Sequence, residues 1–182
     1  VWTALEGVCV KVQATGIGTG FAAGDGVEVS GCSVARLNGE TVLQAADTDW
    51  VAFPGTVAGG AVTETVMKLR RFVPEMDYVV QSGNRLWGCK YGMVDGKPVN
   101  EIYASKLGDC KNWRCFAGLA TDSYAAARGS DGVFTGAVSY LGNPIFFKER
   151  CMERVYASGS GAHQIVTTEC SGVQKGSARS LQ

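Results

Sequence analysis

The sequence uses one four-residue phrase twice: Ile102-Tyr103-Ala104-Ser105 returns as Val155-Tyr156-Ala157-Ser158. Each copy closes a longer pattern, in which an apolar run, a turn, a second apolar run and a polar loop precede the phrase. A further short apolar segment follows each copy, at 112–116 and at 164–168. Four short strands per unit, repeated at a spacing of roughly 40–55 residues, are typical of β-propeller blades.

The repeat predicts two blades, over about residues 68–120 and about 130–182. Their expected strands lie at 77–80, 85–89, 101–107 and 112–116, and then at 135–140, 145–148, 152–158 and 164–168. Both copies of the phrase fall on the third expected strand, so we expect them to hold the same packing position in successive blades. No segment has sustained helical periodicity, and we expect at most one helical turn, near residues 105–113.

The N-terminal third has a different texture, with short alternating segments separated by glycine-rich turns. Its expected strands are Val8–Val12, Val27–Gly31, Thr41–Ala46 and Trp50–Pro54. They predict a small antiparallel barrel or sandwich over residues 1–60. The small residues at 55–60 mark the boundary, and a connecting strand over 61–69 opens a partial propeller over 61–182. The predicted fold class is therefore all-β.

The composition excludes several classes of function. Of 182 residues, 46% are hydrophobic and 19% are charged, and 17 Lys and Arg balance 17 Asp and Glu. This balance encodes no electrostatic attraction to nucleic acid or to an anionic membrane. The short clusters Arg70-Arg71 and Lys148-Glu149-Arg150 are expected on the surface. No signal-peptide pattern is present, and we expect the chain, which begins at Val1, to be a piece of a longer protein.

The seven cysteines are scattered and odd in number, and no Cys-x-x-Cys pair occurs among them. We expect reduced thiols that pack as small apolar groups, with a disulfide framework or metal site as the alternative. The single histidine, His163, leaves a zinc site without its usual ligands. No metal, cofactor or catalytic residue is assigned from the sequence.

Three patterns that resemble functional motifs have plainer interpretations. The loop Gly16–Gly20 lacks the spacing and ending of a phosphate-binding loop. A Cys–His nucleophile pair would need His163 as base, but that residue is expected in a solvated loop. The carboxylates sit beside turn residues and are expected to bond turn backbone, although a glycosidase pair among them stays an alternative: Asp47, Asp49, Asp77, Asp109, Asp122 and Asp131.

Aromatic residues recur within the expected strands, where they either fill the space between blades or stack on sugars. The set comprises Trp87, Trp113, Tyr103, Tyr140, Phe146, Phe147 and Tyr156. We expect core packing for these side chains. Burial of both Trp87 and Trp113 would remove the best support for sugar binding.

Several longer segments resemble bacteriophage and prophage virion structural proteins. These are propeller-like proteins of tailed phages of gut Firmicutes, labelled tail, neck or packaged-DNA stabilisation proteins. The similarity is specific in Leu86-Trp87-Gly88 and Tyr103–Asp109, and it extends with more generic matches over nearly the whole chain, through Pro74–Cys89, Asn100–Trp113, Phe134–Glu149 and Gly172–Ser177. Gly24–Val27 and Leu37–Gly39 resemble the small β domains inserted in such proteins, which implies an insertion domain over residues 1–60.

The resemblance implies a structural component of a tailed-phage virion, which acts by protein–protein assembly with other virion proteins and carries no catalytic motif. Its implied location is the virion, after synthesis in the cytoplasm of the bacterial host. Two alternatives stay open: a carbohydrate- or receptor-binding propeller of the phage tail, with a host-surface glycan as partner, and a propeller glycosidase. Exposed sheet edges and blade faces predict that the isolated chain is sticky, poorly stable or self-associating.

Overall fold

A computed structural model describes residues 2–3, 8–57, 63–156 and 162–181. The fold is all-β, as predicted: 50% of the described residues lie in strands and 4% in short helical turns. Within these residues the strands form four small antiparallel sheets, none of which closes. The chain divides into two compact units, Val1–Phe72 and Val73–Gln182.

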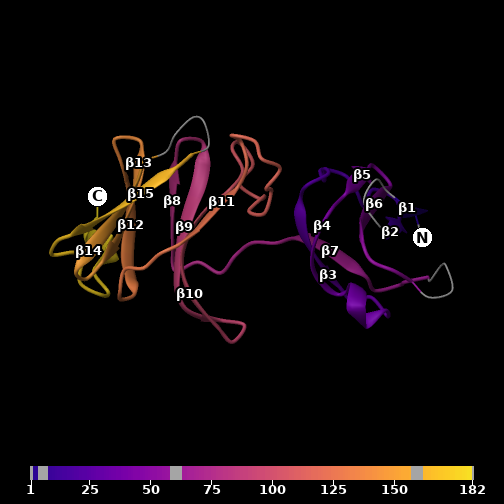
Figure 1. The fold of residues 1–182 in the computed structure, drawn as a ribbon, viewed down its shortest axis with the longest axis horizontal. Coiled ribbons are helices and arrows are strands. Elements are labelled where there is room, and N and C mark those ends of the chain that lie inside the picture. Colours follow the sequence, from indigo (N-terminus) through magenta and orange to yellow (C-terminus); the bar gives the residue numbers. More distant parts are fainter. Residues whose placement is uncertain (1, 4–7, 58–62, 157–161, 182) are drawn as a thin grey trace. The chain divides into compact units, whose positions relative to one another are not determined.

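The N-terminal unit contains two of the sheets, whose strands are labelled in Figure 1. One has the order β1-β2-β6-β5, and its strands are Trp2–Thr3, Val8–Gln13, Trp50–Pro54 and Ala45–Asp47. The other has the order β4-β3-β7, and its strands are Gly39–Val42, Gly26–Ser30 and Lys68–Arg71. A 3-10 turn, η1 at Ala35–Leu37, precedes β4. Both sheets contribute to one apolar core, which includes Val27, Val29, Val51 and Phe53.

Strand β7 brings residues beyond 60 into the N-terminal unit. It pairs with β3, with Leu69 opposite Val29. The connecting strand expected over 61–69 is observed only at its end, because residues 63–67 lie outside any strand and 61–62 lie outside the described residues. Because β7 pairs with the edge of β3 that β4 leaves open, β7 belongs to the N-terminal unit. The boundary between the two compact units in the chain therefore lies between Phe72 and Val73.

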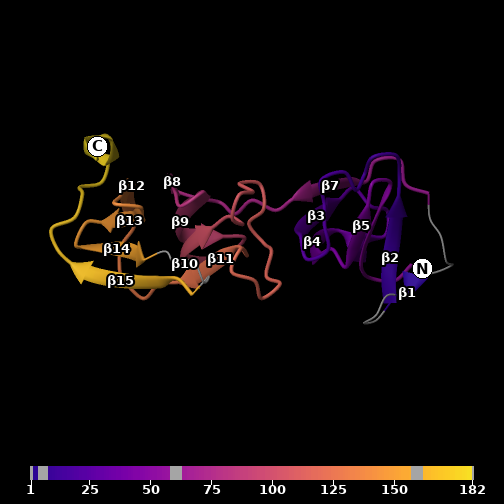
Figure 2. The ribbon, with the colours of Figure 1, turned by 90° about the horizontal axis from the view of Figure 1, so that it is seen from above.

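The C-terminal unit consists of two four-stranded meanders, in which neighbouring strands follow one another along the chain (Figures 1 and 2). The first meander comprises β8 Tyr78–Ser82, β9 Arg85–Val94, β10 Lys97–Ala104 and β11 Tyr124–Ala127. The second comprises β12 Phe134–Tyr140, β13 Asn143–Lys148, β14 Cys151–Tyr156 and β15 Gln164–Glu169. Seven of these eight strands lie where the sequence predicts them.

The fourth strand of the first meander is the exception. It was expected at 112–116, but β11 lies at Tyr124–Ala127 and pairs with β10. Trp113 and Cys115 are nevertheless buried. The apolar character of this segment therefore anchors a loop and does not mark a strand.

The first hairpin of each meander has the same turn, so residues at the same distance from that turn are equivalent in the two meanders. In each meander the first two strands end on a tight turn, closed by the pair Ser82–Arg85 in one and Tyr140–Asn143 in the other. Trp87 lies two residues after Arg85, and Ile145 lies two residues after Asn143. Trp87 and Ile145 are therefore counterparts.

The next ladder corrects the interpretation of the repeated phrase. Trp87 pairs with Ala104, and Ile145 pairs with Arg154. Ala104 and Arg154 are therefore counterparts, whereas the phrase would align Ala104 with the residue three positions beyond Arg154. Because successive strand residues point to opposite faces, the two copies present opposite faces of their sheets. The expectation that both copies hold the same position is wrong, although both begin on the third strand.

The counterparts define equivalent faces of the two meanders. We call the face that carries Trp87 or Ile145 the front, and the opposite face the back. Ile102 belongs to the front of the first meander, because its ladder partner Cys89 lies two residues after Trp87 on β9 and therefore points to the same face. Phe146 and Val155 belong to the back of the second meander. All of these residues except Ile145 share one buried apolar cluster, so the front of the first meander packs on the back of the second.

Candidate functional site

The interface between the two meanders is the most extensively built feature of the C-terminal unit. Its apolar part consists of Trp87, Cys89, Ile102, Ala104, Phe134, Phe146 and Val155. The rings of Phe134 and Phe146 meet edge to face, with centroids 6.1 Å apart. At the turns of the first hairpins, the Ser82 hydroxyl donates to the Gly142 carbonyl oxygen at 2.8 Å. The first strands, β8 and β12, lie beside one another there (Figures 1 and 2).

Lys148 is fully buried in this interface. Its ammonium donates to the Asn100 Oδ1 atom at 3.0 Å and to the Ser130 carbonyl oxygen at 2.8 Å. The same ammonium lies 4.5 Å from the centroid of the Phe134 ring. Burial lowers the pKa of Lys148, because loss of solvent penalises the charged form. The expectation of a surface charge cluster at 148–150 is thus wrong for Lys148, which strand alternation places beside Phe146 on the inward face.

Glu153 is the buried acid of the same interface. Arg128 donates to the Glu153 Oε2 atom from Nη2 at 2.8 Å and from Nε at 3.2 Å. The hydroxyls of Thr167 and Ser130 donate to the carboxylate at 2.9 Å and 2.6 Å. Arg128 follows β11 of the first meander, so this ion pair ties the end of one meander to the back of the other. The buried carboxylate is paired and hydrogen-bonded, as a buried charge must be.

His163 contributes to the interface from the segment before β15. Its ring is nearly perpendicular to those of Trp87 and Tyr124, with both centroid distances 5.1 Å. Burial lowers the pKa of His163, and the nearby Arg85 cation lowers it further. The expected solvated loop histidine is instead half-buried between two aromatic rings.

Arg85 organises the long loop between β10 and β11. Its buried guanidinium donates to three backbone carbonyl oxygens, those of Ser105, Ala120 and Asp122, at 2.6, 2.8 and 2.5 Å. Burial lowers the pKa of Arg85. The loop is therefore held at both of its ends by one side chain.

The cysteines occupy mainly apolar positions. Five of the seven are buried, namely Cys9, Cys32, Cys89, Cys115 and Cys151, and all seven are free thiols. Burial raises the pKa of the Cys89 thiol, which keeps it protonated. Across residues 2–3, 8–57, 63–156 and 162–181, no group of three or more His, Cys, Asp or Glu side chains could hold a metal ion.

Most of the carboxylates considered for catalysis bind turn backbone. Asp47, Asp109 and Asp122 accept N–H donors from residues close in sequence, and Asp49 accepts the Gly16 N–H. The expected bonding of an aspartate to its own turn is confirmed for Asp47, Asp109 and Asp122, whereas Asp49 bonds the backbone of a loop distant in sequence. Asp131 is exposed in the segment between the meanders.

Asp77 takes part in an ion-pair cluster on the first meander. It lies 3.1 Å from the Lys90 ammonium, and Glu75 lies 3.5 Å from the same group. The Asp77 carboxylate also accepts the Tyr91 N–H. Two carboxylates thus converge on one cation.

Amide N–H groups of the glycine loop at 16–20 donate hydrogen bonds to the turn at residues 48–49. Gly16 N–H donates to Asp49 and Gly18 N–H donates to the Thr48 carbonyl oxygen. A Cβ atom at Gly18 would lie 1.8 Å from the Asp47 carbonyl oxygen, so close backbone approach requires glycine there. These two donors are bonded to the turn at residues 48–49 and are not available to a phosphate.

The two candidate tryptophans for sugar stacking are core residues. Trp87 is 0% and Trp113 5% exposed, and their indole N–H groups donate to the carbonyl oxygens of Ser82 and Cys110. Core packing is confirmed for these two and for Phe146. Tyr140 and Tyr156 are exposed, and Tyr103 and Phe147 are half-buried.

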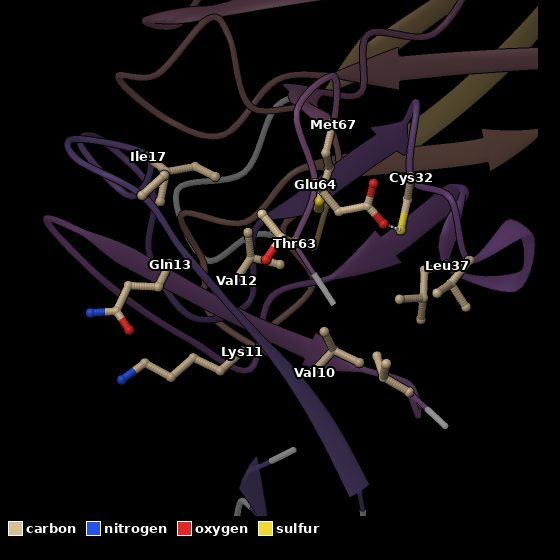
Figure 3. Close-up of a pocket in the computed structure, with 13 residues that line it drawn as sticks. Val10, Lys11, Val12, Gln13, Ile17, Cys32, Leu37, Thr63, Glu64 and Met67 are labelled. Atoms are coloured by element: carbon tan, nitrogen blue, oxygen red, sulfur yellow. Dashed lines mark hydrogen bonds between the residues drawn. The ribbon is translucent and has the colours of Figure 1, made fainter. Parts of the chain in front are cut away.

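The N-terminal unit contains a cavity of about 450 Å³ beside β2. Figure 3 shows Glu64 directed toward Cys32, whose thiol donates to the Glu64 Oε1 atom at 3.3 Å. The Ser33 hydroxyl donates to the same oxygen at 2.6 Å. The lining is mainly aliphatic, and the Glu64 carboxylate is used to hold the neighbouring turn.

Comparisons with known proteins identify no relative: no family model, no curated protein and no solved structure matches the chain. Among the described residues, no helix has the length and apolar character needed to span a membrane.

Proposed function

We propose that the chain is a structural module of a tailed-phage virion protein, in which a small β barrel or sandwich precedes two consecutive propeller blades. The module acts by protein–protein assembly and performs no catalysis. Its partners are other virion proteins, and its location is the virion, after synthesis in the cytoplasm of the bacterial host.

The observation that carries the structural part of this proposal is the packing of unlike faces. Consecutive blades of a propeller are related by rotation, so the front of one blade meets the back of the next. The front of the first meander, with Trp87, packs on the back of the second, with Phe146. In addition, both meanders have four antiparallel strands in chain order, with their first strands adjacent.

The virion part of the proposal rests on the resemblance of the Leu86-Trp87-Gly88 and Tyr103–Asp109 segments to phage structural proteins. The geometry supports a scaffold role through residues that serve packing. Arg85, Lys148 and Glu153 each fix the position of neighbouring backbone or side chains.

The two alternatives receive less support. A glycan-binding surface loses its strongest candidates, because Trp87 and Trp113 are buried. A glycosidase would need two carboxylates on either side of a cleft, whereas Asp77 and Glu75 both bind the Lys90 ammonium.

Purified phage particles test the virion assignment. Mass spectrometry should detect peptides of this chain at a constant ratio to other virion proteins through successive gradient purifications. An antibody against the chain should label one defined part of the particle in immunogold electron microscopy. Loss of the peptides during purification, while they remain abundant in the cell lysate, would contradict the proposal.

A further inference from the structure

The packing between the meanders implies a second contact surface of the same kind. The front of the first meander is covered by the back of the second. The two counterpart surfaces are the front of the second meander and the back of the first. The chain therefore has one front and one back that no other sheet of its C-terminal unit covers.

The front of the second meander has an apolar character and a partial cover. It carries Ile145, Phe147, Met152, Arg154, Tyr156 and Val166. Near β12, the side chain of Leu181 packs against Gly136, as does Ala178 of η2 (Ala178–Ser180), at the C-terminal end visible in Figure 2. Over β14 and β15, Met152 and Val166 are half-buried and Tyr156 is exposed. This half of the face is accessible to a partner.

Arg154 lies on that accessible half. Its guanidinium is 4.8 Å from the centroid of the Tyr156 ring. Its Nε atom is buried and has no hydrogen-bond partner within the part of the chain that the structure describes. Arg154 as a whole is half-buried, so its guanidinium offers a partner carboxylate a site for charge pairing.

The back of the first meander supplies complementary groups. Val79 is 49% exposed there, and its counterpart in the second meander, Ala137, packs against the interface cluster. Glu101 lies opposite Lys90 on the same face, and Glu75 and Asp77 bind the Lys90 ammonium. These three carboxylates outnumber the two ammonium groups of Lys90 and Lys97 on this face, so its net charge is negative, whereas Arg154 makes the other face positive.

We propose that a second copy of this chain binds the front of the second meander through the back of its own first meander. The contact repeats the front-to-back packing seen within the chain. Because it joins unlike surfaces, every added copy leaves one face of each type free, and association continues until it closes into a ring or extends as a filament. The proposal deepens the assembly role above, and it rests on the assembly part of that function.

Sedimentation of the 182-residue chain over a rising concentration series tests the contact. The wild type should form oligomers larger than a dimer. Arg154→Glu reverses the charge on the front, and Glu101→Lys reverses it on the back. Each variant alone should bind itself about tenfold or more weakly than the wild type, because like charges then face each other.

Mixing the two variants gives the decisive result. The Glu101→Lys copy retains its front and the Arg154→Glu copy retains its back, and the two reversed faces carry opposite charges, so an equimolar mixture should regain association beyond a 1:1 dimer. Lys111→Glu, which makes the same charge change on an exposed loop residue, should associate like the wild type. Thermal melts confirm that each variant folds.

Three results would overturn the inference. One is a wild-type chain that stays monomeric at all concentrations, and another is a mixture that forms no dimer although both variants fold. The third is association that Arg154→Glu abolishes and Glu101→Lys leaves intact, which would indicate a symmetric front-to-front contact. None of these results would remove the chain from purified particles, so they are distinguishable from failure of the virion assignment.

Discussion

The two meanders have the same connectivity but contribute different chemistry to their common interface. The first presents an apolar front of Trp87, Cys89, Ile102 and Ala104, whereas the second presents a back in which Lys148 and Glu153 are fully buried beside Phe146. Hydrophobic burial supplies most of the stabilisation in such a contact. The ion pair between Glu153 and Arg128 adds little net stability but is costly to break, as is usual for buried ion pairs. The difference indicates that the apolar half provides stability and the polar half fixes the alignment of the sheets.

Removing the largest apolar side chain should have the greatest effect. Trp87→Ala deletes a fully buried indole that packs against Tyr124 and His163, and we expect it to lower the free energy of unfolding by about 3–5 kcal/mol. Urea unfolding followed by NMR signals of each unit would measure the loss in the C-terminal unit alone. Tyr140→Ala, at an exposed ring, should change stability by less than about 0.5 kcal/mol. Similar losses for both variants would contradict an interface centred on Trp87.

Breaking the polar half should cost less than this, but more than a surface substitution. Glu153→Gln leaves Arg128 without its carboxylate, and we expect a loss of about 3 kcal/mol. The double variant Arg128→Met, Glu153→Leu removes both charges, so it should be more stable than Glu153→Gln alone. The same urea measurement compares the two. A double variant that is the less stable of the pair would show that the ion pair itself is a main source of stability.

The strands of the C-terminal unit were largely predictable because their apolar alternation and turns are local signals. The fourth strand of the first meander was missed for a physical reason. Asn112–Phe116 has the apolar spacing of a strand, yet Trp113 and Cys115 are buried as loop anchors. The alanine-rich β11 has a weaker sequence signal for a strand, and it is a strand because its backbone pairs with β10.

The interface itself was only partly predictable. The repeated phrase suggested equivalent positions, but register depends on ladder pairings distant in sequence, and a three-residue offset exchanges the faces. The burial of Lys148 could have been predicted, because it lies two residues after Phe146 on one strand and therefore shares the face of that apolar residue. Its partner Asn100 lies in another sheet, and no sequence signal joins the two.

The aromatic end of the interface should respond to pH. His163 is the single histidine, and its pKa is lowered in the folded chain by burial and by Arg85. Above the unfolded pKa of about 6.5 the residue is neutral in both states. Below it the unfolded chain binds the proton more readily, so stability should fall as the pH drops from about 7 toward the lowered pKa.

His163→Phe should flatten that pH dependence while it retains the ring between Trp87 and Tyr124. Free energies of unfolding at several pH values between about 5 and 7.5 would compare the variant with the wild type. An unchanged slope in His163→Phe would assign the pH dependence to other groups.

The smallest effect is expected at the turns of the first hairpins. Ser82→Ala removes the hydroxyl that donates to the Gly142 carbonyl oxygen, and we expect a loss of about 1 kcal/mol. The urea series on the C-terminal unit would detect it. A loss as large as that of Trp87→Ala would shift the centre of the contact from the apolar cluster to these turns.

The relation between the two sheets is the central claim, and nuclear Overhauser effects from the Trp87 indole test it most directly. The account predicts contacts between Trp87 and the ring of His163, whose centroid lies 5.1 Å away, together with contacts to the Val155 methyl groups at the back of the second meander. Contacts from Trp87 to Ile145 or Met152 would mean that the two fronts face each other, and they would contradict the account.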